Sequence, residues 1–116
     1  MTSADPPHSP IACRMDALTP AERTRRGEVL ALLTERALDI VETADGVAFQ
    51  LRGDPDTPAL AGEFVAYESR CCPFIRFELT VEAEGGPVRF ALGGREGVGD
   101  FLRAMFPAGM TRSGTS

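Results

Sequence analysis

The cysteines are the residues of this chain best suited to chemistry, because a thiolate is both a nucleophile and a ligand for soft metal ions. Two of the three, Cys71 and Cys72, are adjacent in the stretch ESRCCPFIRFEL, and Pro73 follows them directly. The third, Cys13, lies in the segment IACRMDALTP. Three thiols at two places in the sequence raise the question of whether the fold brings them together.

If the three sulfurs converge, they suit a thiophilic ion such as Hg(II), Cu(I) or As(III). We therefore expect a metal site formed by Cys13, Cys71 and Cys72, with a soft metal ion as the one cofactor the sequence suggests. Zinc is less well served, because a closed structural zinc site has four ligands. The single histidine, His8, lies in a Pro-rich segment and is a weak candidate for a fourth ligand. No residue pattern predicts a catalytic or a cofactor-binding site.

Redox chemistry is the first alternative, with Cys72 as nucleophile and Cys13 as resolving thiol. Adjacent cysteines bridge each other only through a strained ring, so Cys13 is the more plausible partner for Cys71 or Cys72. Arg70 and Arg76 lie near enough in sequence to stabilise a thiolate, whereas the C-terminal end of the helix dipole disfavours one, and the sequence leaves the balance between the two effects open. The second alternative is an interaction domain in which the cysteines merely pack as small apolar residues. With an odd number of cysteines and no export signal, we expect free thiols first and a disulfide second.

The elements around the cysteines follow from capping and periodicity. Thr19, Pro20 and Glu22 have the spacing of a capping box, which predicts a helix over 20–37. Ahead of it, three apolar residues could anchor the segment that carries Cys13 over the other two cysteines: Ile11, Met15 and Leu18.

The second helix is predicted to begin with Thr57 as its cap and to end before Pro73. Its apolar face carries residues at i, i+4, i+7 and i+11, namely Leu60, Phe64, Tyr67 and Cys71. Cys71 should therefore point into the core, whereas Cys72 should be accessible in an extended or turn conformation. Tyr67 is predicted either to line the thiol site or to pack in the core. On the same helix, Glu63 and Glu68 could orient a ligand or a neighbouring arginine, but we expect them to be exposed.

Two hairpins complete the pattern. Asp45-Gly46 predicts a two-residue turn with positive φ, and Gly85-Gly86 predicts the second turn. The buried faces of the second hairpin are expected to be Ile75, Phe77, Leu79 and Val81, then Val88, Phe90 and Leu92. A last helix is predicted over 95–106, with four residues inward: Val98, Phe101, Leu102 and Met105.

The order α-β-β-α-β-β-α predicts an α+β domain of two layers, a four-stranded, mainly antiparallel sheet with helices on one face. A length of 116 residues fits one domain, which we place at 11–107, with disordered tails at 1–10 and 108–116.

Charge and hydropathy narrow the possible partners. The net charge of −5 argues against binding to nucleic acid. The basic cluster in the first helix, Arg23, Arg25 and Arg26, is interpreted as a solvated face because the same segment also holds Glu22 and Glu28. No apolar run is long enough for a membrane span, and the first ten residues do not resemble a secretory signal, so we expect a cytoplasmic protein. The expected partner is a soft metal ion or a small thiol-reactive molecule, with a homodimer left open.

Three stretches, LTPAERTRR, RCCPFIRFEL and GREGVGDFL, resemble a group of small uncharacterised bacterial proteins that share a Cys-Cys-Pro-Phe motif. The motif is also similar to one in C-terminal segments of some MerR-type regulators linked to mercury and other heavy metals. The resemblance covers most of residues 11–106 and carries over to Cys71, Cys72, Pro73 and Phe74, with Cys13 matching an upstream Ala-Cys segment. It implies thiol-based handling of a soft metal. A complete MerR-type regulator contains a DNA-binding helix-turn-helix, and the sequence of this chain shows none.

Overall fold

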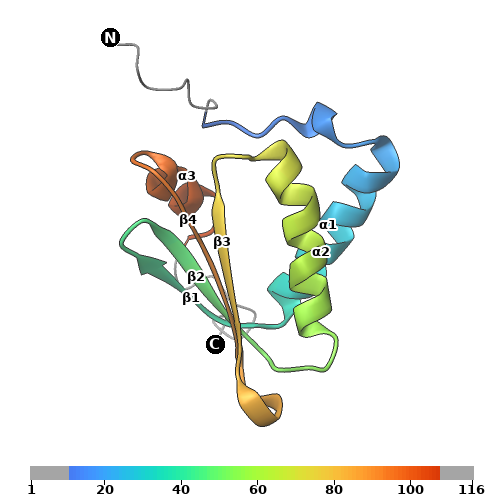
Figure 1. Ribbon diagram of the computed structural model, residues 1–116, viewed down its shortest axis with the longest axis vertical. Coiled ribbons are helices and arrows are strands. Elements are labelled where there is room, and N and C mark those ends of the chain that lie inside the picture. Colours follow the sequence, from blue (N-terminus) through green and yellow to red (C-terminus); the bar gives the residue numbers. More distant parts are fainter. Residues whose placement is uncertain (1–10, 108–116) are drawn as a thin grey trace.

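The computed structural model describes residues 11–107, so both predicted tails, and His8 with them, lie outside the described residues. In chain order the elements are α1 (Pro20–Glu35), β1 (Ala37–Thr43), β2 (Gly46–Leu51), α2 (Thr57–Cys71), β3 (Arg76–Val81), β4 (Val88–Gly93) and α3 (Val98–Met105), with short 3-10 turns at Met15–Ala17 and Ala83–Gly85. The predicted order α-β-β-α-β-β-α is confirmed (Figure 1).

The four strands form one sheet in the order β1-β2-β4-β3, and every neighbouring pair is antiparallel. The two hairpins therefore meet through β2 and β4 at the centre. Phe49 of β2 contacts Phe90 of β4, and both rings point toward the helices. Phe64 of α2 packs edge-on against Phe90, and Phe106, which follows α3, packs edge-on against Phe49. The helices thus cover one face of the sheet, with α1 and α2 side by side (Figure 1).

The N-terminal ends of α1 and α2 can be compared with the predicted N-cap residues. At α1 the capping box is present, because the Glu22 amide donates to the Thr19 hydroxyl and the Thr19 amide donates to the Glu22 carboxylate. At α2 the prediction is off by one residue. Asp56 precedes the helix without a side-chain cap, and Thr57 is the first helical residue. The buried Thr57 hydroxyl accepts a hydrogen bond from Arg36 instead, at 3.1 Å.

The first hairpin corrects the interpretation of Gly46. Ala44 and Asp45 form the turn, Thr43 pairs with Gly46, and neither Asp45 nor Gly46 has a positive φ. Gly46 is needed for a different reason, because a Cβ built there would clash with the carbonyl oxygen of Leu92 in β4. The glycine allows close approach of two backbones at the centre of the sheet.

The edges of the core are less buried than predicted. Leu79 lies opposite Phe90 and shares its face, as expected, but Leu79 and Val81 are 40% and 51% exposed because β3 is an edge strand. The last helix is shorter than the predicted 95–106, and Met105, expected inward, is 36% exposed.

Candidate thiol site at the α2–β3 corner

The two adjacent cysteines lie where α2 ends. Cys71 is its last residue, and Cys72 leaves the helix with φ −129° and ψ 69°, the non-helical geometry predicted for the residue before Pro73. The Cys72 amide still donates to the carbonyl oxygen of Glu68 at 2.7 Å. Both cysteines are 0% exposed, which confirms the prediction for Cys71 and overturns the expected accessibility of Cys72.

An N-terminal strap, defined here as residues 11–18, passes over the C-terminal end of α2 (Figure 1) and contacts both adjacent cysteines. The backbone N–H of Arg14 donates to the carbonyl oxygen of Cys71 at 2.7 Å, and the Arg70 guanidinium donates to the carbonyl oxygen of Ala17 at 3.0 Å. Two predicted anchors, Ile11 and Met15, pack against the core, and Leu18 is fully part of it. The strap is therefore held by apolar packing as well as by hydrogen bonds.

This packing brings Cys13 to Cys72. Their sulfurs are bonded at 2.06 Å, and their Cα atoms are 4.7 Å apart although 59 positions separate them in sequence. We expected free thiols first, so the disulfide is a correction. The expected partnership of Cys13 with one of the adjacent cysteines is confirmed, and the structure selects Cys72. Cys71 is a free, buried thiol whose Sγ lies 3.8 Å from that of Cys72. All three sulfurs of the chain thus form one cluster.

The cluster includes a carboxylate that we expected to be exposed. Glu68 is 0% exposed, and the thiol of Cys71 donates to its Oε1 at 3.5 Å. Arg26 of α1 binds both carboxylate oxygens, with Nε to Oε1 at 2.6 Å and Nη2 to Oε2 at 3.1 Å. The Arg26 side chain is only 12% exposed, so its assignment to a solvated face was also wrong. Its guanidinium lies 5.5 Å from the centre of the Phe64 ring.

A signal for Glu68 was present in the sequence. It follows Phe64 by four positions and precedes Cys71 by three, which puts it beside both on the inner helix face. A charged residue at such a position is buried only if it is paired. The partner, Arg26, lies 42 positions away in sequence, and its approach depends on the packing of α1 against α2.

The electrostatics of the cluster keep Cys71 protonated. Burial is the main cause that raises the pKa of the Cys71 thiol, and the negative charge of Glu68 raises it further. The guanidinium of Arg26 acts in the opposite direction but does not reverse the shift. Cys71 is therefore not poised as a reactive thiolate in the oxidised protein.

The arginines nearest to the cysteines in sequence are engaged by other groups. Arg70 binds Glu22 at 2.9 Å, and Arg76 binds Asp45 at 2.7 Å. The cation that binds the carboxylate of the cluster is Arg26, which the sequence did not suggest. Tyr67 donates to the carboxylate of Glu63 at 3.1 Å, on the side of α2 where Arg25 binds the same carboxylate at 2.7 Å.

One set of potential ligand atoms lies within the cluster. The sulfurs of Cys13 and Cys72 and a carboxylate oxygen of Glu68 all lie within 4.8 Å of one another. Sulfurs joined in a disulfide are not thiolates, so this set can hold a metal ion only after the bond is reduced. Reduction would give a Cys/Glu site with Cys71 at its side.

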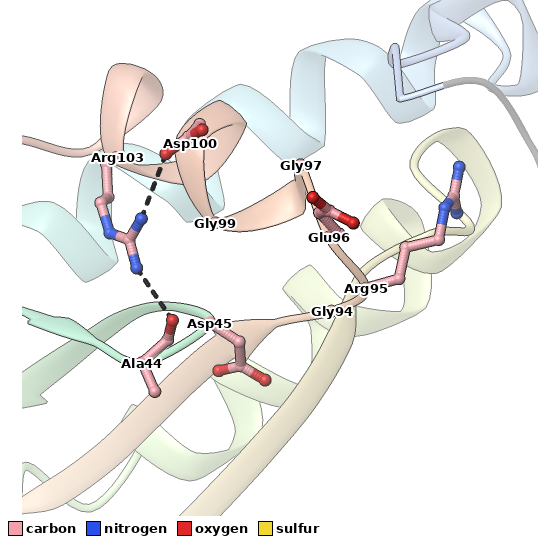
Figure 2. Close-up of a pocket in the computed structure, with 9 residues that line it drawn as sticks. All are labelled: Ala44, Asp45, Gly94, Arg95, Glu96, Gly97, Gly99, Asp100 and Arg103. Carbon is pink, nitrogen blue, oxygen red and sulfur yellow. Dashed lines mark hydrogen bonds and ion pairs between the residues drawn. The ribbon is translucent and has the colours of Figure 1, made fainter.

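A separate hollow of about 270 Å³ lies between the β1–β2 turn and the loop before α3 (Figure 2). Its lining is Ala44, Asp45, Gly94, Arg95, Glu96, Gly97, Gly99, Asp100 and Arg103. Arg103 donates across it to the carbonyl oxygen of Ala44 at 3.2 Å and to Asp100 at 3.3 Å. None of the three cysteines is among the described residues that line it, so it is not part of the thiol site.

The fold and the site together define a small α+β protein with a three-sulfur cluster at a helix–strand corner, in which Cys71 and Cys72 are buried and Cys13 is half-buried. Compared with known proteins, the chain matches no protein-family model, no curated protein and no solved structure. Among residues 11–107, no helix is long and apolar enough to cross a membrane.

Proposed function

We propose that the protein binds a soft metal or metalloid ion, of the Hg(II), Cu(I) or As(III) type, through Cys13, Cys71 and Cys72 in their reduced form. The observation that carries this proposal is the convergence of all three sulfurs, since Cys72 is bonded to Cys13 and lies 3.8 Å from the sulfur of Cys71. Soft ions prefer thiolate ligands, and a set of three suits trigonal coordination.

Metal binding requires the disulfide to be opened first. Reduction adds two electrons and two protons to the Cys13–Cys72 bond, taken from a dithiol that is itself oxidised to a disulfide. The ion then displaces the thiol protons as it binds the sulfurs. In the oxidised protein the sulfur of Cys72 is fully buried under the strap, so the redox state would control access to the site.

The surroundings of the sulfurs favour a bound cation over a free thiolate. Thiolates in an apolar corner next to Glu68 would place several negative charges out of water, which is unfavourable. A bound cation offsets them, and Arg26 adds a fixed positive charge, since its guanidinium binds Glu68 at 2.6 Å.

A thiol-redox or thiol-transfer enzyme is the second candidate, and the Cys13–Cys72 disulfide is the observation that favours it. In that case Cys72 attacks a substrate and Cys13 resolves the mixed disulfide. The burial of Cys72 opposes this candidate, because a catalytic thiol must be accessible to its substrate.

The likeness to small bacterial proteins with a Cys-Cys-Pro-Phe motif, and to segments of MerR-type regulators, stays a prediction. It agrees with the proposal, because it implies the same class of ion. Whether the protein forms a homodimer, which the sequence left open, is likewise untested.

Native mass spectrometry tests the proposal. The reduced and the oxidised protein are each titrated with Hg(II), Cu(I) and Zn(II), together with three single variants: Cys13→Ser, Cys71→Ser and Cys72→Ser. We expect one equivalent of a soft ion in the reduced wild type, none in the oxidised protein, and weakened binding in every variant. Equal binding by oxidised and reduced protein, or binding that ignores all three substitutions, would refute the proposal. Turnover of a small disulfide by the reduced protein, lost in Cys72→Ser, would favour the redox candidate.

A further inference from the structure

The cluster contains a group that a three-sulfur site does not explain, the carboxylate of Glu68. Resting on the proposed function, we propose that Glu68 is the fourth ligand of the reduced site, and that Cys13, Cys71, Cys72 and Glu68 together take a four-coordinate divalent ion such as Zn(II). The sequence argued against zinc only because a fourth ligand was missing. The structure places a carboxylate in that position.

The distances around Cys71 match a tetrahedral zinc site. With Zn–S bonds of about 2.3 Å, Zn–O bonds of about 2.1 Å and tetrahedral angles, neighbouring ligands lie about 3.8 Å apart for two sulfurs and about 3.6 Å for sulfur and oxygen. The Sγ atoms of Cys71 and Cys72 are 3.8 Å apart, and the Sγ of Cys71 lies 3.5 Å from Oε1 of Glu68. The two separations that involve the Cys71 sulfur are thus those a zinc ion requires, and the sulfur of Cys72 lies within 4.8 Å of a carboxylate oxygen of Glu68.

Cys13 supplies the fourth corner. Its sulfur lies within 4.8 Å of a carboxylate oxygen of Glu68, and it is carried by the strap and not by a helix. Reduction frees this sulfur from Cys72, so it can turn to the remaining position while the other three ligands stay on the end of α2. Three ligands from one corner and one from a separate segment would let the metal replace the disulfide as the link between strap and helix.

Arg26 provides the outer contacts that a carboxylate ligand needs. Its two hydrogen bonds to Glu68, at 2.6 and 3.1 Å, fix the carboxylate and use one lone pair of each oxygen. The second lone pair of Oε1 accepts from the Cys71 thiol and becomes available when that thiol loses its proton to bind the ion. Ligating carboxylates are commonly held in this way by a second layer of hydrogen bonds. The guanidinium also offsets part of the negative charge of three thiolates and one carboxylate.

A contribution to stability alone does not explain the buried ion pair of Arg26 and Glu68. A buried ion pair is weak evidence for a stabilising role, because apolar residues of similar volume often serve as well or better. The contact between the Glu68 carboxylate and the Cys71 thiol is explained if both groups bind the same ion.

The chain offers a matched control for a test of Glu68. Glu63 lies on the same helix and is also held by two hydrogen bonds from an arginine of α1, Arg25, at 2.7 and 3.0 Å. Its side chain is 31% exposed, and it is not among the ligand atoms that cluster with the cysteines. Glu63→Gln therefore changes the same kind of pair without touching the proposed site.

The experiment titrates the reduced full chain with Zn(II) and with Co(II), whose visible absorption reports the ligands. We expect one tightly bound ion in the wild type, with the intense visible bands of tetrahedral Co(II). Glu68→Gln should weaken Zn(II) binding by at least about tenfold and shift the visible bands, whereas Glu63→Gln should do neither. Glu68→His should retain tight binding, because three cysteines and one histidine form a common zinc site. Circular dichroism of each variant checks that the fold is kept.

The outcomes separate this inference from the proposed function. Unchanged Zn(II) affinity and Co(II) bands in Glu68→Gln would overturn the role of Glu68, as would a reduced wild type that takes Hg(II) or Cu(I) but not Zn(II); both results leave soft-ion binding intact. A loss of Zn(II) in Glu68→His as deep as in Glu68→Gln would show that the ion pair matters only for structure. A reduced wild type that binds none of the four ions would refute both proposals.

Discussion

Reduction of the Cys13–Cys72 disulfide should strongly destabilise the protein. The bond joins residues 59 positions apart, so it closes a loop that contains α1, β1, β2 and α2. For a loop of about 60 residues, the chain-entropy relation gives about 4 kcal/mol of stabilisation at 25 °C through restriction of the unfolded chain. A domain of this size has a free energy of unfolding of about 5–15 kcal/mol, so the bond contributes a large fraction of it.

Urea unfolding followed by circular dichroism measures this effect, with a chelator present so that no ion replaces the bond. With a urea dependence of about 2 kcal/mol/M, the midpoint should fall by about 2 M when a reductant is added. Cys13→Ser should unfold at the midpoint of the reduced wild type and should not respond to the reductant. Cys71→Ala keeps the disulfide, so it should still respond. If the oxidised and reduced wild type unfold at the same urea concentration, the idea that the bond restrains the unfolded chain is wrong.

Three further predictions concern charged and titrating groups. Arg26→Met leaves its buried glutamate partner without a counter-charge and should lower the free energy of unfolding by about 3–5 kcal/mol, whereas Arg25→Met at the more exposed pair should change it far less. Both values come from urea unfolding, and equal effects would contradict the assigned burial. The Arg70 guanidinium, followed by the amide of Thr19, lowers the pKa of Glu22 from 4.5 to about 2. Its stabilising contribution is therefore complete above pH 4.5 and is lost as the pH falls through about 2, so Glu22→Gln should flatten the loss of stability in acid; an unchanged acid slope would count against this. Since burial raises the pKa of Cys71, iodoacetamide at pH 8 should modify it in the oxidised protein only after denaturant is added, as mass spectrometry would show.

Local rules predicted most of the secondary structure. The capping box at Thr19 and Glu22 depends on residues three apart, and the end of α2 before Pro73 depends on a clash between neighbours, so both could be predicted from the sequence. The turn at Asp45-Gly46 was misassigned because the prediction used only neighbouring residues. Glycine is needed at position 46 because of Leu92, a residue of another hairpin.

The sequence by itself determined the α-β-β-α-β-β-α order and the inward direction of Cys71, because caps, turns and helical periodicity act over a few residues. Only the tertiary structure decided that Cys13 pairs with Cys72 and that Arg26 pairs with Glu68. These contacts join residues 59 and 42 positions apart, and they depend on how the strap and α1 pack against α2. Packing of separate elements is a property of the whole core, so local sequence patterns contain the residues of the site but not their arrangement.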